Sequence, residues 1–410
     1  MNYNITVSFV TFFKNYIENF LSLPKESRIG ILLSFIESSL SGICFFLSLY
    51  FVKVLQINIS LAGLIISCYA LGTAFGGLAG GKFSDNTDPK LIAGISLAVE
   101  GAAFLALIVF SNPYFLMLNL FILGMAIYGF LIANNVWVIQ QCNKDENTKL
   151  QAINFLYIAS NCGFGIAALI IILLTPHSFQ YVFLLSGICL LTSSFTLLLH
   201  KTKKSQILCS QNITKIDPDN TFEKNQNNKK IIILVLSCLF LVGLIISQRS
   251  AVYLIYIHNL FPNSGMLGTA LVFVLNPLLI VLLQTSIISY FKNSNKLLVI
   301  GVGASLMGLG MYMLEFSFVF PLLILACVIY TIGEILFFAM AQFVCYQKSD
   351  TNKKGSGLGI FKTVYAISII IGPVLAGYIY HHLGSSFLWI LDGIFGLLCF
   401  LSCNYFKKYI

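Results

Sequence analysis

Six ionisable side chains stand inside long apolar stretches of the chain, and this placement makes them the residues best suited to do chemistry. They are Glu37, Glu100, Arg249, Glu334, Lys362 and Asp392. If such a stretch spans a membrane, a charge within it costs at least about 2.5–3.5 kcal/mol, so it persists only where it is paired, hydrated or used. We therefore take these six as candidates for binding a proton or a solute.

Two of the carboxyl groups, those of Glu37 and Glu334, are the candidates for proton coupling. A proton-driven process needs a buried carboxyl group that gains and loses its proton near the working pH. Arg249 suits a different task, because a guanidinium keeps its proton and can hold a carboxylate through two parallel hydrogen bonds. Tyr253 and Tyr256 follow Arg249 by four and seven residues, so a continuous helix puts all three on one face.

Other polar side chains within the apolar stretches are expected to contact the solute. They are Asn135, Gln248, Asn276 and Lys362. Each amide has the alternative of a hydrogen bond between two helices, and Lys362 has the alternative of extending to the lipid headgroups. The 11 cysteines include no CxxC pair and no cluster with histidine, so we interpret them as small apolar fillers and predict no metal site.

The elements that must position these residues follow from composition. Of the 410 residues, 58% are hydrophobic and 10% are charged, whereas a soluble domain is about 25% charged. A soluble fold and a disordered chain are both excluded, and the long apolar runs differ from the alternating strands of a membrane barrel. We predict an all-α polytopic membrane protein. A span needs about 20 apolar residues, and twelve segments qualify: about 29–52, 60–82, 91–110, 114–139, 151–174, 179–199, 231–257, 264–291, 297–316, 320–346, 357–381 and 385–406.

The basic residues indicate how these segments cross the bilayer. With twelve spans, 21 of the 24 Lys and Arg residues fall in the segments on one side. The three exceptions are Lys53 at a helix end, and Arg249 and Lys362 within helices. Cytoplasmic loops carry such an excess of Lys and Arg, so both termini are predicted to lie in the cytoplasm.

One long polar stretch, residues 200–230, divides the chain into two equal parts. We predict a cytoplasmic linker here, between a six-helix bundle at 29–199 and a second at 231–406. Residues 1–28 are expected to be a cytoplasmic segment, with an interfacial amphipathic helix as the alternative, and 407–410 a cytoplasmic tail. Two equal halves are typical of transporters built from repeats.

A short loop between the second and third predicted helices carries the most specific motif. Gly81, Asp85 and Lys90 match the pattern G-x-L-x-D-r-x-G-r-r/k, while Asn86 and Asp88 depart from it. The loop resembles the signature of the major facilitator superfamily. That resemblance implies a gating role, in which Asp85 accepts hydrogen bonds from a helix N-terminus or a basic side chain. The alternative is a loop held by turn chemistry alone.

The resemblance also implies which helices line a central cavity, namely the first, fourth, seventh and tenth. Glu37, Arg249 and Glu334 fall on these, whereas Glu100 and Asp392 fall on peripheral helices and are expected to be structural. The layout is similar to that of drug:proton antiporters, although the fourth-helix arginine and the fifth-helix proline are missing. The segments around Asn276 and Glu334 resemble helices eight and ten of proton-dependent oligopeptide transporters, but the ExxER motif of their first helix is absent.

These features together predict a proton-coupled secondary transporter for a small polar solute that bears a carboxylate. A siderophore or related metabolite is one such solute, and export is favoured over import. The alternatives are an importer of amino acids or small peptides, a multidrug exporter, and a non-transporting receptor or enzyme. The sequence holds no HExxH, P-loop or GxSxG motif. We expect no cofactor beyond the proton gradient, no nucleic-acid partner, a functional monomer, and residence in a bacterial inner membrane.

Overall fold

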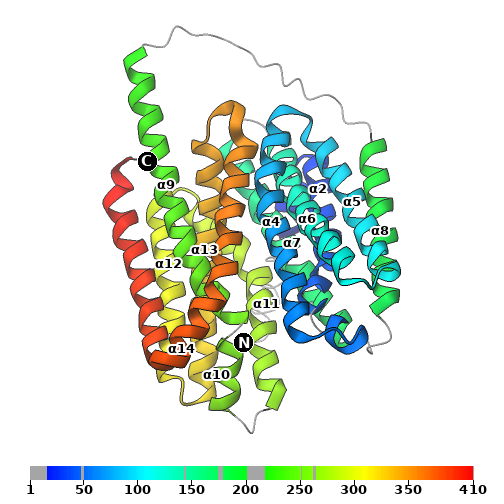
Figure 1. The fold of residues 1–410 in the computed structure, drawn as a ribbon. Helices are drawn as coiled ribbons and strands as arrows, with labels where there is room; N and C mark the ends of the chain where they lie inside the picture. Colours follow the sequence, from blue (N-terminus) through cyan, green and yellow to red (C-terminus); the bar gives the residue numbers. More distant parts are fainter. Residues whose placement is uncertain are drawn as a thin grey trace, which may run out of the picture.

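The computed structural model describes residues 16–47, 50–142, 145–173, 179–200, 218–250, 252–261 and 265–409. The described residues form helices and connecting turns and contain no strand. Figure 1 shows the helices running side by side in two bundles. The prediction of an all-α polytopic protein is therefore confirmed.

The first half of the chain contains the helices that precede the predicted linker. A short helix at 16–21 comes first. It is followed by α2 (Lys25–Ser41) with its continuations η1 (Gly42–Phe46) and η2 (Tyr50–Val54), α4 (Ile59–Asn86), α5 (Pro89–Val109), α6 (Pro113–Gln141), α7 (Glu146–Leu173) and α8 (Phe179–Leu199).

The second half repeats the arrangement with two interrupted helices. Its elements are α9 (Pro218–Ser247), η4 (Gln248–Ser250), α10 (Val252–Leu260), α11 (Gly265–Phe291), α12 (Lys296–Tyr312), η6 (Met313–Phe316), α13 (Phe320–Lys348), η7 (Thr351–Lys353), α14 (Lys354–Phe406) and η8 (Lys407–Tyr409). The long α14 bends back on itself at Gly384, where φ is 86°. Glycine adopts this left-handed conformation without the clash that a side chain would add.

The helices account for the predicted spans. Ten described helices are long and apolar enough to cross a membrane, α14 crosses twice because of its bend, and α7 has the length of a span with 28 residues. One boundary differs from the prediction, because α9 begins at Pro218, within the segment expected to be linker. Residues 201–217 and 1–15, the remaining parts of the predicted linker and N-terminal segment, lie outside the described residues.

Alternating helix directions bring one set of ends together. Helix α8 stops and α9 emerges at the same end of the molecule as the C-terminus (Figure 1); we call this the linker end. The connections α4–α5, α6–α7, α11–α12 and α13–α14 also lie there by alternation. Side-chain caps define several helix starts: Asp88 accepts from the Lys90 amide at 3.0 Å, and Asn295 accepts from the Leu298 amide at 3.2 Å.

Each half packs its helices in the same pairs. In the first half α2 packs on α7, α4 on α6, and α5 on α8; in the second half α9 packs on the first arm of α14, and α12 on its second arm. The halves meet along two seams, α4 against α14 and α7 against α11. Side chains that lie along these seams can contact the other half of the protein.

Candidate functional site

A cluster of polar side chains surrounds Glu334 in the interior of the second half. Asn276 of α11 donates from Nδ2 to Glu334 Oε2 at 2.8 Å, and also to Thr331 Oγ1 at 2.9 Å. Arg249 Nη1 lies 3.8 Å from Glu334 Oε2. Since only 8% of the surface of Glu334 is exposed, these partners are what stabilise a charge at this position.

The position of Arg249 depends on an interruption of its helix. Residues Gln248–Ser250 form a short 3-10 turn between α9 and α10. A discontinuous helix in the middle of a membrane protein is a recurring feature of binding sites for solutes and coupling ions. The Arg249 guanidinium also lies over the Tyr330 ring, 5.0 Å from its centroid, a distance typical of a cation–π contact.

Tyr157 of α7 connects this cluster to the first half of the protein. Its hydroxyl donates to Glu334 Oε1 at 2.6 Å. The Tyr157 ring stacks on Phe338 at 5.7 Å, and Phe338 in turn meets Tyr365 of α14 edge-on at 5.6 Å. The carboxyl group of Glu334 thus has neighbours on both sides of the α7–α13 contact.

The space beside Arg249 is small in this conformation. Arg249, Tyr253 and Tyr330, with apolar residues of α12 and α13, line a cavity of about 10 Å³. This is close to the lower limit for holding one water molecule. Binding of a solute next to Arg249 therefore requires the surrounding helices to move apart.

The structure separates two of the predicted binding residues from Arg249. Gln248 donates from Nε2 to Asp392 Oδ1 at 2.6 Å, and only 3% of Gln248 is exposed. The Tyr256 hydroxyl donates to the Leu314 carbonyl at 3.0 Å, and its ring meets Trp389 at 5.2 Å. The helix that was expected to carry Arg249, Tyr253 and Tyr256 is interrupted by the 3-10 turn at Gln248–Ser250, although Tyr253 still lines the cavity beside Arg249.

The other predicted proton-coupling residue, Glu37, lies within the first half. It is 3% exposed, and Ser38 donates to its Oε2 at 3.0 Å. Glu100 of α5 is fully buried and interacts electrostatically with Glu37. Neither Glu100 oxygen has a hydrogen-bond partner among the described residues. The first half thus contains two buried carboxyl groups that lie close enough to interact.

Two further predicted residues lie apart from the hydrogen bonds of the Glu334 cluster. Asn135 is 7% exposed on α6, beside Asn134, which joins α6 to α2 by donating to the Gly30 carbonyl and to Ser34 Oγ, both at 2.8 Å. The Lys362 ammonium lies 5.9 Å from the Phe361 ring centroid. Within the described part of the chain, no carboxylate forms an ion pair with Lys362.

Gly81 and Asp85 of the motif lie in the last turns of α4, which continues to Asn86, so the predicted loop is helical at these positions and faces the α4–α14 seam. Asp85 Oδ1 accepts from the Gly355 amide at 2.5 Å, and Oδ2 accepts from the Ser356 amide at 2.8 Å and from the Ser356 hydroxyl. Both amides belong to the first turn of α14, where a helix favours negative charge. A Cβ at Gly81 would lie 2.6 Å from the Gly355 carbonyl oxygen, so only glycine permits this close approach.

Lys90, the third motif residue, makes its contact inside the first half. Its ammonium donates to the carbonyl of His200 at the end of α8. It therefore caps a helix C-terminus and lies away from the α4–α14 seam. Lys354 plays the equivalent part in the second half, since its ammonium donates to the Tyr346, Gln347 and Ser349 carbonyls at 2.6–2.9 Å.

The α7–α11 side of the linker end is closed by different groups. Glu146 at the start of α7 accepts from Gln347 and lies 3.9 Å from the Lys296 ammonium. Asn154 donates from Nδ2 to Thr285 Oγ1 at 3.3 Å. In this structure the two halves are thus joined across both seams at the linker end.

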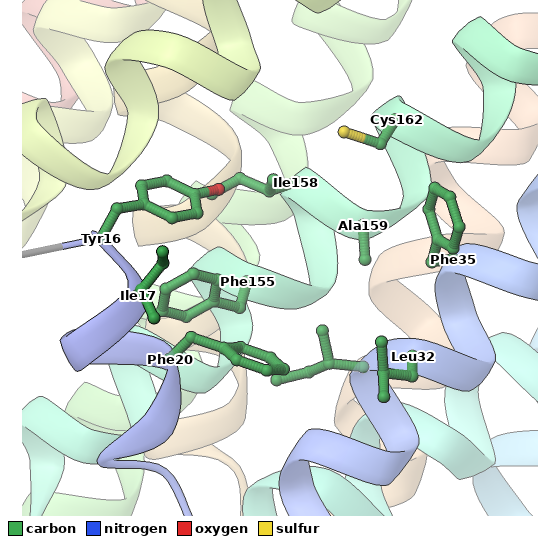
Figure 2. Close-up of a pocket in the computed structure, with 10 residues that line it drawn as sticks. Tyr16, Ile17, Phe20, Leu32, Phe35, Phe155, Ile158, Ala159 and Cys162 are labelled. Carbon is green, nitrogen blue, oxygen red and sulfur yellow. The ribbon is translucent and has the colours of Figure 1, made fainter. Parts of the chain in front are cut away.

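A larger cavity elsewhere has the wrong chemistry for a polar solute. It measures about 240 Å³ and is lined by residues such as Phe20, Leu32, Phe35, Phe155 and Cys162 (Figure 2). Its lining atoms are apolar. Among the described residues, no group of three or more His, Cys, Asp or Glu side chains is arranged to hold a metal ion.

Sequence reasoning misses two aromatic residues of the Glu334 cluster, Tyr157 and Tyr330. A tyrosine in an apolar span has no local feature that separates a site residue from a packing residue. Tyr157 lies 177 positions from Glu334 in sequence, so only the tertiary structure brings them together.

Comparison with known proteins identifies a family for most of the chain. The family model described as Major Facilitator Superfamily matches residues 29–373. An uncharacterized MFS-type transporter of Bacillus subtilis (strain 168), YttB, is 23% identical over 336 residues, covering 80% of this chain and 81% of that protein.

Solved structures show the same fold. The human organic anion transporter MFSD10 aligns with a TM-score of 0.67 and 14% identity, covering 93% of this chain and 100% of the other. A POT family transporter in complex with a thioalcohol-conjugated peptide aligns with a TM-score of 0.67 and 16% identity, covering 95% and 99%. A point mutant of the nucleoside transporter NupG aligns with a TM-score of 0.62 and 16% identity, covering 94% and 100%.

The bonds of Asp85 predict the effect of removing its charge. In Asp85→Asn we expect amide hydrogen exchange at Gly355 and Ser356 to rise about tenfold or more, since a hydrogen bond to a charged group contributes roughly 1.5–3 kcal/mol. Exchange is measured by mass spectrometry on the purified protein. Asp88→Asn is the matched control, because Asp88 is an acidic residue of the same loop that caps α5 instead of α14. Unchanged exchange at the start of α14 in Asp85→Asn would contradict a latch at this seam.

Proposed function

The chain belongs to the major facilitator superfamily and is an integral multi-pass membrane protein of the transporter class, and we propose that it is a proton-coupled carrier of a small polar solute bearing a carboxylate. The observation that supports this best is the arrangement of Glu334 between Arg249 and Tyr157. It combines a group that can exchange a proton, a permanent cation that can hold an anion, and a contact between the two halves.

The proposed coupling follows from competition for Arg249. While Glu334 is ionised, it attracts Arg249 and accepts hydrogen bonds from Asn276 and Tyr157. A proton on Glu334 cancels its charge and frees the guanidinium to bind a carboxylate of the solute. The 3.8 Å separation of Arg249 and Glu334 is longer than a hydrogen bond, so the solute replaces an ion pair held by charge alone.

Protonation of Glu334 would also act on the contact between the two halves. Protonation of Glu334 weakens its attraction for the Tyr157 hydroxyl, which crosses from the first half. The halves can then separate at the linker end and admit the solute, and the Asp85 contact with α14 is the second bond that must break. This is alternating access with the solute site near the middle of the membrane.

Glu37 is proposed as a second proton site. It is buried in the first half and interacts with Glu100, with a serine hydroxyl as the hydrogen-bond partner of one oxygen. Two buried carboxyl groups that interact are a suitable place for a proton to bind and to be released. We propose no cofactor beyond the proton gradient and a functional monomer.

For the direction of transport we propose export of a carboxylate metabolite, such as a siderophore, from the cytoplasm of a bacterial cell. Because the proton and the solute bind together in the coupling described above, the outward gradient of the solute drives this export and the proton leaves with the solute. The linker end, which the basic residues assign to the cytoplasm, is then the loading side. The bacterial relative supports a location in a bacterial inner membrane. A multidrug exporter of lipophilic cations is less well supported, because Arg249 and Lys362 place positive charge in the interior.

Import of amino acids or small peptides is the second candidate function. The observation that favours it is the pairing of Arg249 with Glu334, since two opposite charges in one site suit a solute with both an ammonium and a carboxylate group. The similarity in fold to a POT family transporter bound to a peptide conjugate is consistent with this alternative.

One experiment tests the class and direction of the solute. Metabolites are compared between a deletion strain and its parent, both inside the cells and in spent medium, and candidates are then tested for counterflow in proteoliposomes. A solute retained in the mutant cells and missing from the medium supports export, and one left unused in the medium supports import. Counterflow of neutral or cationic solutes only would contradict the carboxylate proposal.

Removal of the Tyr157 hydroxyl tests the contact between halves. In Tyr157→Phe we expect proton-driven transport to fall about tenfold, with solute affinity changed by less than about threefold, because the lost bond to Glu334 is worth roughly 1.5–3 kcal/mol. Both are measured in proteoliposomes with an imposed pH gradient. Tyr365→Phe is the control, since its ring also meets Phe338. An equal loss in both variants would point to packing rather than to this bond.

Arg249 is tested through the charge of the solute. In Arg249→Ala we expect binding of the carboxylate solute to weaken by about tenfold to a hundredfold, while its methyl ester binds as it does to the parent protein. Binding is measured by isothermal titration calorimetry. Arg249→Lys should recover part of the affinity, because it keeps the charge but loses the two-bond geometry. A parallel loss for acid and ester would remove Arg249 as the anion site.

Glu37 is tested through the difference between exchange and net transport. In Glu37→Gln we expect solute exchange to continue and proton-driven accumulation to be abolished, because an amide cannot release a proton. Both modes are compared in the same vesicles. Glu315→Gln is the control, a carboxylate that accepts from Ser386 at the end of the bundle remote from the linker. Accumulation at the parent level in Glu37→Gln would exclude Glu37 as the coupling site.

A further inference from the structure

A short helix at residues 16–21 lies on the side of the bundle where the two halves meet along α7 and α11. It precedes α2 and is tied to it through Leu23, which is 2% exposed and packs in the core of the first half. Its end is fixed by the Ser22 amide and Leu23 amide, which donate to the Glu18 and Phe20 carbonyls at 2.9 and 3.2 Å.

One face of this helix is anchored on α7 by aromatic contacts. Tyr16 and Phe20, one helical turn apart, both meet the ring of Phe155 edge-on, at 5.3 and 5.4 Å. Figure 2 shows the three rings together. Such edge-to-face pairs stabilise a contact by more than the buried area alone would, so the helix has a defined position on α7.

The cavity in Figure 2 indicates where the helix is not supported. It separates residues 16–20 from Leu32 and Phe35 of α2, and Ile158 and Ala159 of α7 form its floor. The 16–21 helix is therefore held by α7 and by the second half beyond α7. Its contact with α2, the helix that follows it in sequence, is loose.

The Tyr16 side chain also reaches the second half of the protein. The Tyr16 hydroxyl shares a hydrogen bond with the side chain of Thr285 on α11. Thr285 also accepts from Asn154 of α7 at 3.3 Å. Asn19 lines a cavity of about 130 Å³ with residues of α7 and α11, among them Asn154, Thr285 and Lys292. The helix thus contacts both sides of the α7–α11 seam.

We propose that residues 16–21 form a strap that holds the linker end closed across the α7–α11 seam. The strap belongs to the first half through Phe155 and Leu23, and it contacts the second half through Thr285. The hydrogen bond between Tyr16 and Thr285 exists only while α7 and α11 are adjacent. A contact made in one conformation and lost in the other shifts the equilibrium between them, so the strap favours the closed linker end.

This strap is independent of the solute and of the proton sites proposed above. It also differs from the Asp85 latch, which acts on the α4–α14 seam through a helix N-terminus. Each seam of the linker end then has its own stabilising contact, and both contacts must break before the linker end can open.

Hydrogen exchange on the full-length protein tests the strap without a known solute. In Tyr16→Phe we expect amide exchange in 147–154 and 285–292 to rise about fivefold, the ratio that the loss of one hydrogen bond supplies. In Thr285→Val the rise should be at least as large, because this variant also removes the bond from Asn154. Exchange at 355–363 on the other seam should rise with it, because both seams part when the linker end opens. Thr285→Ser keeps the hydroxyl and should exchange like the parent protein.

Two controls separate a strap from local packing. Tyr181→Phe removes a hydroxyl from an exposed tyrosine of α8 and should change no seam. The double variant Tyr16→Phe with Thr285→Val should exchange no faster than the faster of the single variants, since both remove the same bond. A rise confined to 16–21 and 147–154, with the α4–α14 seam unchanged, would overturn the proposal, as would additive effects in the double variant.

Discussion

A carboxylate in the interior of a membrane protein must be stabilised by its neighbours, and Glu334 draws those neighbours from both halves of the chain. Asn276 and Arg249 come from the second half, and Tyr157 comes from the first. In a low dielectric, any change in the charge of this one group alters the energy of every bond to it. The carboxyl group is therefore positioned so that its protonation state affects the ion pair and the contact between halves together.

The polar contacts between the halves are individually modest, which suits a protein that must change conformation. At the linker end they include the bonds of Asp85 to α14 and the polar contacts of Glu146 and Thr285 on the other seam, and they lie beside apolar residues of α6 and α7 that pack into the core of the second half. A ligand needs about 5.5 kcal/mol of differential binding to reverse a 1:99 equilibrium. Each of these polar contacts, at roughly 1–3 kcal/mol, is small enough for such a ligand to outweigh.

Hydropathy and charge are sufficient to predict the spans, because a lipid environment forces long apolar helices and basic loops. The candidate site is predictable in part. Arg249, Asn276 and Glu334 stand out individually as charged or polar residues in apolar spans, and the structure places them in contact. Tyr256 groups with Arg249 only on the assumption of a regular helix, which the 3-10 turn at Gln248–Ser250 interrupts. Gln248 is the sequence neighbour of Arg249, but its side chain donates to Asp392. Tyr157 requires the tertiary fold, since its role depends on a partner in the other half.

The two seams show that a repeated architecture need not be closed by repeated chemistry. The end of α4 carries Asp85, which binds the N-terminus of α14, whereas the corresponding connection from α11 to α12 has no acidic residue and leads into Lys296. A cation cannot cap a helix N-terminus, because the dipole there repels it. Lys296 instead lies 3.9 Å from Glu146, a residue whose side chain is 57% exposed, and an exposed pair of this kind contributes little. The α7–α11 seam therefore lacks a fastening equivalent to Asp85 within the described loops, and the aromatic seat and hydroxyl contact of Tyr16 supply one from the segment that precedes α2.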